Sequence, residues 1–221
     1  MPRLVTVAHG TRTPAGNVVA RELTALAGER LGIEAVASYV ELSEPLFADV
    51  LREPYDGETV AVPLLLSTGY HVRVDLPEAV AGAADPSRVR LARPFGPDPL
   101  LAQAQVARLL EAGAEVGQSV TMVAAGSSDP AALDAIGVAA SLLAEAWGSP
   151  VRFAALGGLG PRPAEVVQPG DAVSSYLLAT GFFHRKLVGE VKELGAGGVA
   201  DVIGPHPLAV DLLVRRSAGH F

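Results

Sequence analysis

The feature that most constrains the fold is an apolar run of eight residues, 59–66, which ends abruptly in a polar, glycine-containing segment, 67–75. Apolar runs rich in branched residues are typical of strands buried on both faces of a parallel sheet. His71 follows this run, and in open α/β sheets ligands bind just beyond the carboxyl end of a strand. A second run of the same kind, residues 4–8, is followed by His9. Two histidines at predicted strand ends therefore indicate a functional site.

The first half of the chain alternates predicted strands and helices four times. Residues 15–31 carry apolar side chains at helical spacing up to Gly32, which predicts an amphipathic helix. Residues 34–40 form the next predicted strand, and Ser43 and Pro45 then suit the N-cap and the first turn of a short helix. After the 59–66 run we predict a helix beginning near residue 75, a strand over 89–92 and a helix over 97–112.

The second half repeats this order, which indicates an internal duplication. Three segments of the first half have similar counterparts in the second: residues 9–14 match 125–130, residues 64–71 match 176–184, and residues 96–100 match 204–208. Gly113 and Gly117 bracket a short polar connection between the halves. We therefore predict two domains, an N-terminal lobe over residues 1–116 that carries the active site and a C-terminal degenerate repeat lobe over residues 117–221.

The alternation predicts the fold class as well. Alternating strands and helices favour an α/β fold with two similar lobes, each a parallel sheet covered by helices on both faces. With right-handed crossovers, each lobe suits a flavodoxin-like strand order, in which the first and third strands are neighbours. In that order His9 and His71 follow adjacent strand ends, so we expect the two imidazoles to converge.

His9 and His71 are the first candidate site residues. Neutral imidazole binds first-row divalent metals and accepts protons near neutral pH, so the pair suits metal handling or proton transfer. Glu41 follows the second predicted strand at the same rim of the sheet and is a further candidate metal ligand. Glu44 is interpreted as a solvated carboxylate near a helix N-terminus.

The loops beside the two histidines suit an anionic ligand. They offer backbone amides, hydroxyls and a guanidinium that can bind carboxylates, although ordinary turns use the same residue types. No dinucleotide fingerprint follows a strand and the sequence has no phosphate-binding P-loop, so nucleotide binding is not predicted. The loop residues considered for ligand binding are Gly10, Thr11, Arg12, Ser67, Thr68, Gly69 and Tyr70.

The second half does not rebuild the histidine pair. Ala125 stands at the position that matches His9, so one working site per chain is expected. His184 and His206 remain in this half, and whether they contact a substrate stays open.

Composition excludes several classes of function. The 17 basic and 24 acidic residues give a net charge of −7 without a dense basic cluster, which disfavours nucleic acids and anionic membranes as partners. The sequence has no cysteine, which excludes thiolate metal sites, disulfides and cysteine nucleophiles. No signal segment precedes the first predicted strand and no apolar stretch is expected to span a bilayer, so we expect a cytoplasmic protein.

Three motifs together resemble the sirohydrochlorin chelatase family, the class II chelatases related in fold to the ferrochelatase of protohaem synthesis. They are Val7-Ala8-His9-Gly10-Thr11-Arg12, the segment 39–45 with sequence YVELSEP, and the segment 62–77 with sequence VPLLLSTGYHVRVDLP. The resemblance is strong up to about residue 112 and weaker, though in register, over 119–216. This extent resembles the long, two-lobed form of the family, in which one chain carries both halves of an arrangement that short forms build as homodimers.

The resemblance implies a lyase that inserts Fe²⁺ or Co²⁺ into sirohydrochlorin without ATP, in sirohaem or cobalamin biosynthesis. His9 and His71 fall on the two active-site histidines of the family and would bind the metal and accept protons, with Glu41 assisting. The metal is then a substrate, so no permanent cofactor is expected. Arg12, Arg73 and the loop amides would meet the carboxylates of the tetrapyrrole.

The sequence departs from the family pattern at two points. Thr11 stands where many members have serine, and Ala125 and Phe183 leave the second lobe without a histidine pair. The second departure argues against an active site in the C-terminal lobe.

Two other functions stay open from the residues alone. One is a non-catalytic carrier of a metal or a tetrapyrrole, which would retain its ligand without turnover. The other is a metal-dependent hydrolase, but this class normally needs three or more protein ligands, and the first half has no third histidine. The choice between iron and cobalt stays open, and the duplicated chain is compatible with a monomer or a homodimer.

Overall fold

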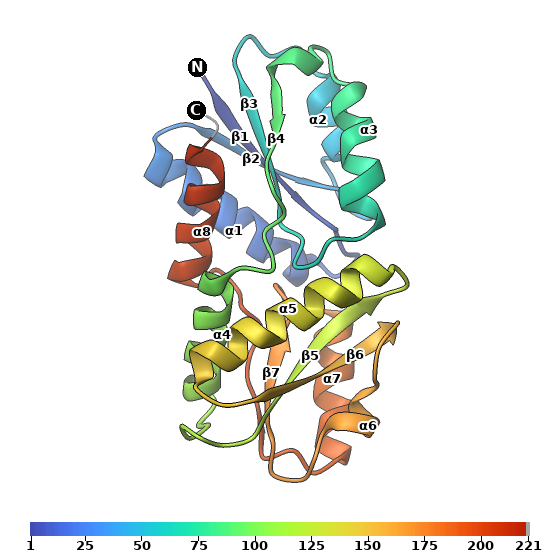
Figure 1. The fold of residues 1–221 in the computed structure, drawn as a ribbon. Helices are drawn as coiled ribbons and strands as arrows, with labels where there is room; N and C mark the ends of the chain where they lie inside the picture. Colours follow the sequence, from blue (N-terminus) through green and yellow to red (C-terminus); the bar gives the residue numbers. More distant parts are fainter. Residues whose placement is uncertain (220–221) are drawn as a thin grey trace. The chain divides into compact units, whose positions relative to one another are not determined.

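The computed structural model describes residues 1–219, which fold into two α/β units, each with its own four-stranded parallel sheet (Figure 1). Unit 1 comprises Met1–Phe95 and the C-terminal segment from Ala209, and unit 2 comprises Gly96–Leu208. The predicted fold class is confirmed, because both sheets are entirely parallel and are covered by helices.

Unit 1 has the strand order β2-β1-β3-β4, so the first and third strands are neighbours as predicted. Strand β1 pairs with β2 from Arg3↔Glu34 to Ala8↔Tyr39 and with β3 from Arg3↔Thr59 to Val7↔Pro63. Its elements are β1 (Arg3–Ala8), α1 (Pro14–Leu31), β2 (Glu34–Tyr39), α2 (Phe47–Arg52), β3 (Thr59–Pro63), the π-helical turn η1 (His71–Asp75), α3 (Leu76–Ala81), the 3₁₀ turn η2 (Pro86–Arg88), β4 (Val89–Leu91) and most of α8 (Pro207–Ala218).

The strands of unit 1 are apolar because both faces of the sheet are covered. Val5 and Val7 of β1 pack with α2 and α3 in one core cluster, in which Leu76 is fully buried. On the other face Thr6 meets α1, where its hydroxyl lies 2.5 Å from that of Thr24. The prediction of strands that are buried on both faces of the sheet is therefore confirmed.

Two local predictions were wrong. The short helix α2 begins at Phe47, so Ser43 is not its N-cap and Pro45 is not in its first turn. Instead, the Ser43 hydroxyl accepts a hydrogen bond from Asn17, and the Glu44 carboxylate accepts one from the Leu46 amide. The hydroxyl of Ser43 and the carboxylate of Glu44 thus form hydrogen bonds within the loop, and the local capping pattern did not predict the start of the helix.

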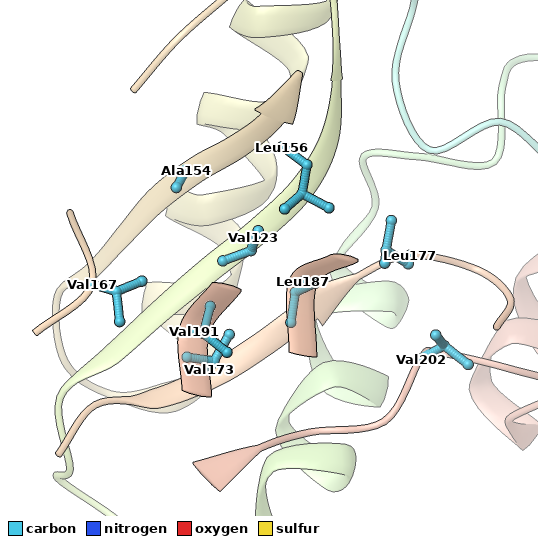
Figure 2. Packing of buried hydrophobic residues seen from close by; sticks show 9 residues of the cluster. All are labelled: Val123, Ala154, Leu156, Val167, Val173, Leu177, Leu187, Val191 and Val202. Carbon is cyan, nitrogen blue, oxygen red and sulfur yellow. The ribbon is translucent and has the colours of Figure 1, made fainter. Parts of the chain in front are cut away.

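Unit 2 repeats the topology with the order β6-β5-β7-β8. Figure 2 shows side chains from three of its strands and from α7 gathered on one face of this sheet, around Val123, Val173 and Leu187. Its elements are α4 (Pro99–Glu111), β5 (Val120–Ser127), α5 (Pro130–Trp147), β6 (Val151–Gly158), α6 (Pro163–Val166), β7 (Ala172–Tyr176), α7 (Phe182–Glu193) and β8 (Gly198–Val199).

Helix α5 explains why a long apolar stretch occurs in this chain. Within residues 1–219 it is the one helix whose length and composition would suit a membrane span, although none was expected from the sequence. One of its faces is buried, and α5 packs on β5, β6 and α4. This is the packing of a helix that covers a sheet in a globular domain. The buried residues are Ala132, Ala135, Ile136, Ala139, Ala140, Leu143 and Trp147.

The helices that end the two halves of the sequence are exchanged between the units. Each sheet lies within its predicted half, 1–116 or 117–221, but α4 belongs to unit 2 and most of α8 to unit 1. Gln105 of α4 accepts a hydrogen bond of 2.9 Å from Ser174 of β7. In α8, Asp211 pairs with Arg30 of α1, and Arg216 donates to the Pro94 carbonyl.

Candidate metal centre

His9 and Glu41 are held side by side by backbone pairing that continues past the ends of β1 and β2. The Val40 amide donates to the Ala8 carbonyl at 2.8 Å, and the Glu41 amide donates to the His9 carbonyl at 3.1 Å. Parallel strands that pair in register end at the same edge of a sheet, so their next residues emerge together. The side chains then meet, with His9 Nε2 at 3.5 Å from Glu41 Oε1.

Gly10 allows this close approach. It has a φ of +92°, and a Cβ atom built on it would lie 1.8 Å from the Glu41 carbonyl oxygen. Both the left-handed backbone and the absence of a side chain are therefore required at this position. The same geometry recurs in unit 2, where a Cβ on Gly126 would lie 2.0 Å from the Gly157 oxygen.

His71 reaches the same edge from β3. The Leu64 amide donates to the Val7 carbonyl at 2.8 Å, which keeps the chain beside β1 before the loop that leads to His71. The sequence pattern placed His71 in a loop, but it is the first residue of the π-helical turn η1. The amide of Leu76 donates to the His71 carbonyl, which closes a wider turn than in an α-helix. Because the Leu76 side chain is fully buried, η1 has a fixed anchor.

The predicted convergence of the two imidazoles is confirmed. The rings of His9 and His71 meet edge to face, with centroids 4.9 Å apart and planes at 86°. One potential ligand atom from each of His9, Glu41 and His71 lies within 4.8 Å of the others. Within residues 1–219 these three form the one group of three or more potential metal-ligating side chains spaced in this way.

This spacing is close to the one that a bound metal ion requires. Two donor atoms on one ion, each about 2.1 Å from it, lie at most about 4.2 Å apart, so only a small rotation of the side chains would close the group around an ion. Two imidazoles and a carboxylate suit first-row divalent metals. The side chains of His9 and Glu41 are about half exposed, at 50% and 51%, which leaves room for a large partner at the metal.

The predicted substrate-binding residues lie in the segments that carry the two histidines. Gly10, Thr11 and Arg12 follow His9 directly, and the Thr11 hydroxyl accepts a hydrogen bond from the Thr13 amide at 3.1 Å. On the other side, Thr68, Gly69 and Tyr70 precede His71, and Arg73 lies in η1. Arg12, Tyr70 and Arg73 are exposed. Their contacts with a substrate remain a prediction.

Unit 2 lacks the chemistry at the corresponding positions. Strand registers and the paired glycines align His9 with Ala125 and Glu41 with Gly157, and Phe183 stands in the place of His71. His184 Nε2 lies 3.9 Å from Asp201 instead.

His206 has a structural role at the start of α8. Its Nδ1 accepts a hydrogen bond from the Leu208 amide at 3.2 Å. Burial lowers the pKa of His206, and the nearby Arg108 guanidinium lowers it further, so the neutral imidazole that can accept this bond is favoured.

Sequence reasoning missed two residues that organise the site. Asn17, buried in α1, donates to the Thr11 carbonyl at 2.8 Å and to the Ser43 hydroxyl at 2.7 Å, and so connects the two loops beside His9 and Glu41. Asp75 Oδ2 lies 2.6 Å from His71 Nδ1. A polar residue within the apolar face of α1 was the available signal for Asn17, and a carboxylate four residues after a histidine was the signal for Asp75.

Known proteins share both the sequence and the fold. A family model described as CbiX matches residues 3–112, the segment that holds the candidate metal centre. The sirohydrochlorin ferrochelatase of Bacillus subtilis is 30% identical over 203 residues, which cover 81% of this chain and 76% of the relative. This chain belongs to the sirohydrochlorin chelatase family.

Solved structures of this family have the same fold over the whole chain. SirB from Bacillus subtilis with Fe³⁺ has a TM-score of 0.84 at 25% identity and covers 100% of this chain and 98% of that one. The SirB chelatase of Bacillus subtilis subspecies spizizenii in complex with cobalt has a TM-score of 0.79 at 26% identity, over 98% and 94% of the two chains. A CbiX of denitrifying bacteria, at 18% identity and a TM-score of 0.73 over 100% of both chains, supports the fold alone.

The contact between Gly10 and Glu41 generates the first prediction. Gly10→Ala should lower the free energy of unfolding by about 3 kcal/mol or more, because it combines left-handed strain with a collision. Gly32→Ala is the matched control, since Gly32 has a φ of +66° but a Cβ added there would have no atom within 4 Å. The control should lose only about 1–2 kcal/mol. Urea denaturation followed by circular dichroism measures both, and equal losses would contradict the argument.

The position of Asn17 generates the second prediction. Asn17→Ala leaves the Thr11 carbonyl and the Ser43 hydroxyl without their donor, and should lower the free energy of unfolding by about 1–3 kcal/mol. Ser141→Ala is the control, because the exposed Ser141 hydroxyl bonds only within its own helix, to Gly137. The control should change stability by less than about 0.5 kcal/mol. If both variants unfold at the same urea concentration as the wild type, Asn17 does not connect the loops.

Proposed function

We propose that this protein inserts a divalent metal ion, Fe²⁺ or Co²⁺, into sirohydrochlorin without ATP, as a lyase of sirohaem or cobalamin biosynthesis. The observation that carries the proposal is the convergence of His9, Glu41 and His71 within 4.8 Å, inside the segment that matches the family model. The names of the relatives support the same reaction, since one is a sirohydrochlorin ferrochelatase and another is a sirohydrochlorin chelatase crystallised with cobalt.

The metal enters this reaction as a substrate. His9 and His71 provide the nitrogen ligands for the incoming ion, and Glu41 supplies a carboxylate that offsets part of its charge. All three side chains reach solvent, and they leave coordination positions for water and then for the nitrogens of the macrocycle. Weak, open coordination favours transfer of the ion over its retention, so the reaction needs no permanent cofactor.

The same imidazoles serve the proton balance. Metallation replaces two pyrrole N–H protons by one divalent ion, so two protons must leave as the metal–nitrogen bonds form. A neutral imidazole released from the metal has a free nitrogen lone pair, which can accept a proton. His9 and His71 therefore bind the ion first and accept the protons afterwards, with Glu41 next to His9 to stabilise the imidazolium.

The carboxylates of sirohydrochlorin provide the recognition. In the proposal, the exposed guanidinium groups of Arg12 and Arg73 bind these carboxylates on the two sides of the histidines. Hydroxyl and backbone donors complete the contacts, from Gly10, Thr11, Thr68, Gly69 and Tyr70.

One active site per chain follows from the asymmetry of the duplication. The N-terminal lobe carries the reaction, and the C-terminal lobe, with Ala125, Gly157 and Phe183 at the equivalent positions, is its degenerate repeat. We propose a cytoplasmic reaction without a nucleic-acid or membrane partner, and the net charge of −7 supports the absence of such polyanionic partners. A monomer and a homodimer both remain compatible with one site per chain.

The activity test follows the absorbance of anaerobic sirohydrochlorin with Co²⁺ or Fe²⁺. The wild type should accelerate the spectral change over the uncatalysed rate, and His9→Ala and His71→Ala should each lower the rate by about 100-fold or more, because each removes a metal ligand and a base. His184→Ala is the control, since His184 belongs to unit 2 and pairs with Asp201, and it should keep the wild-type rate.

The same assay separates the enzyme from the alternatives. If the wild type binds sirohydrochlorin but leaves the uncatalysed rate unchanged with both metals, the chain is a carrier and the chelatase proposal fails. The metal that reacts faster identifies the pathway that the protein serves.

A further inference from the structure

We propose that Asp75 is a positioning residue for His71, which it holds in the tautomer that presents Nε2 to the metal. The inference deepens the proposed function and rests on it for the link to metal insertion. It starts from the distance of 2.6 Å between Asp75 Oδ2 and His71 Nδ1, the shortest polar contact of either active-site histidine in the described residues.

The donor in this hydrogen bond is assigned by chemistry. An ionised carboxylate oxygen has no proton to give, so it can only accept, and Nδ1 of His71 must carry the hydrogen. In a neutral imidazole the proton on Nδ1 leaves the lone pair on Nε2. Asp75 thus decides which nitrogen of His71 can bind a metal ion.

The backbone between the two residues is suited to this task. Both lie in η1, four residues apart, and Asp75 leads directly into α3, whose first residue Leu76 is fully buried. The side chains of His71 and Asp75 are each about one-third exposed, at 33% and 34%, so the pair is partly shielded from solvent. A carboxylate behind a metal-binding histidine also fixes the orientation of the ring.

A different interpretation of the contact is a simple helix-stabilising pair. Exposed pairs with the same spacing contribute little, and Lys186 and Glu190 in α7 form one at 3.6 Å. The two interpretations differ in what an amide should do at position 75. Asparagine has the shape of aspartate and can still bond to the imidazole, so a structural role would survive. However, its NH₂ group can donate to Nδ1 and so favour the tautomer with the proton on Nε2.

The experiment compares Asp75→Asn, Asp75→Glu and the control Glu190→Gln with the wild type. Nitrogen-15 NMR of labelled protein at a fixed, mildly alkaline pH reports the tautomer of His71, and titration with Co²⁺ alone reports metal affinity. We expect wild-type His71 to carry its proton on Nδ1 and Asp75→Asn to shift it to Nε2. Metal affinity and kcat should both fall about 10–100-fold, with the KM for sirohydrochlorin unchanged within about twofold.

The other variants complete the test. Asp75→Glu retains a carboxylate acceptor and should recover part of kcat, and Glu190→Gln should match the wild type. The proposal is overturned if His71 has its proton on Nε2 in the wild type, or if Asp75→Asn keeps kcat and Co²⁺ affinity within twofold. The NMR and Co²⁺ measurements do not depend on turnover, so a wild type without chelatase activity would refute the proposed function and leave this positioning role measurable.

Discussion

The structure of the site depends on the parallel pairing of β1 with strands on both sides. Because β1 is hydrogen-bonded to β2 and to β3 in one register, the three strand ends cannot move independently. The pairing extends beyond the strands, to the bond between the Glu41 amide and the His9 carbonyl, and Gly10 lets the backbones meet there. A sheet edge fixed in this way gives three separate segments of the chain a common position, and the candidate metal-binding group of His9, Glu41 and His71 stands on it.

The duplication separates the scaffold from the chemistry. Unit 2 keeps the strand order, the helix layers and the left-handed glycine at the first strand end, with Gly126 in the place of Gly10. It keeps none of the three candidate ligands. Packing of apolar strands between helices is insensitive to the residue that follows each strand, so the same fold forms with or without these three side chains. Ala125 and Phe183 therefore stand where unit 1 has its two histidines, within the same architecture.

The exposure of the candidate metal-binding group fits a metal ion that is bound only briefly. A structural metal site encloses its ion with a complete ligand set, whereas this group has two imidazoles and one carboxylate at an open edge. The residues that fix the positions of the three side chains lie behind them, away from the open edge. Asn17 links the loops beside His9 and Glu41, and Asp75 bonds to the far nitrogen of His71. An ion bound by these side chains would stay accessible from solvent, which suits the proposed transfer to a large acceptor.

The sequence by itself determined the class of fold, the duplication and the pair of histidines, because buried parallel strands leave long apolar runs and ligands bind where such runs end. The strand order and the convergence of His9 with His71 followed from those runs and are confirmed. The capping signals at Ser43 and Pro45 predicted the start of α2 wrongly, because the Ser43 hydroxyl accepts a hydrogen bond from Asn17 and does not cap the helix. Only the tertiary structure decided three other features, which are the exchange of α4 and α8 between units, the π-helical turn at His71 and the Asp75 contact. Each of these depends on contacts between segments distant in the chain or on a turn geometry that local spacing does not specify.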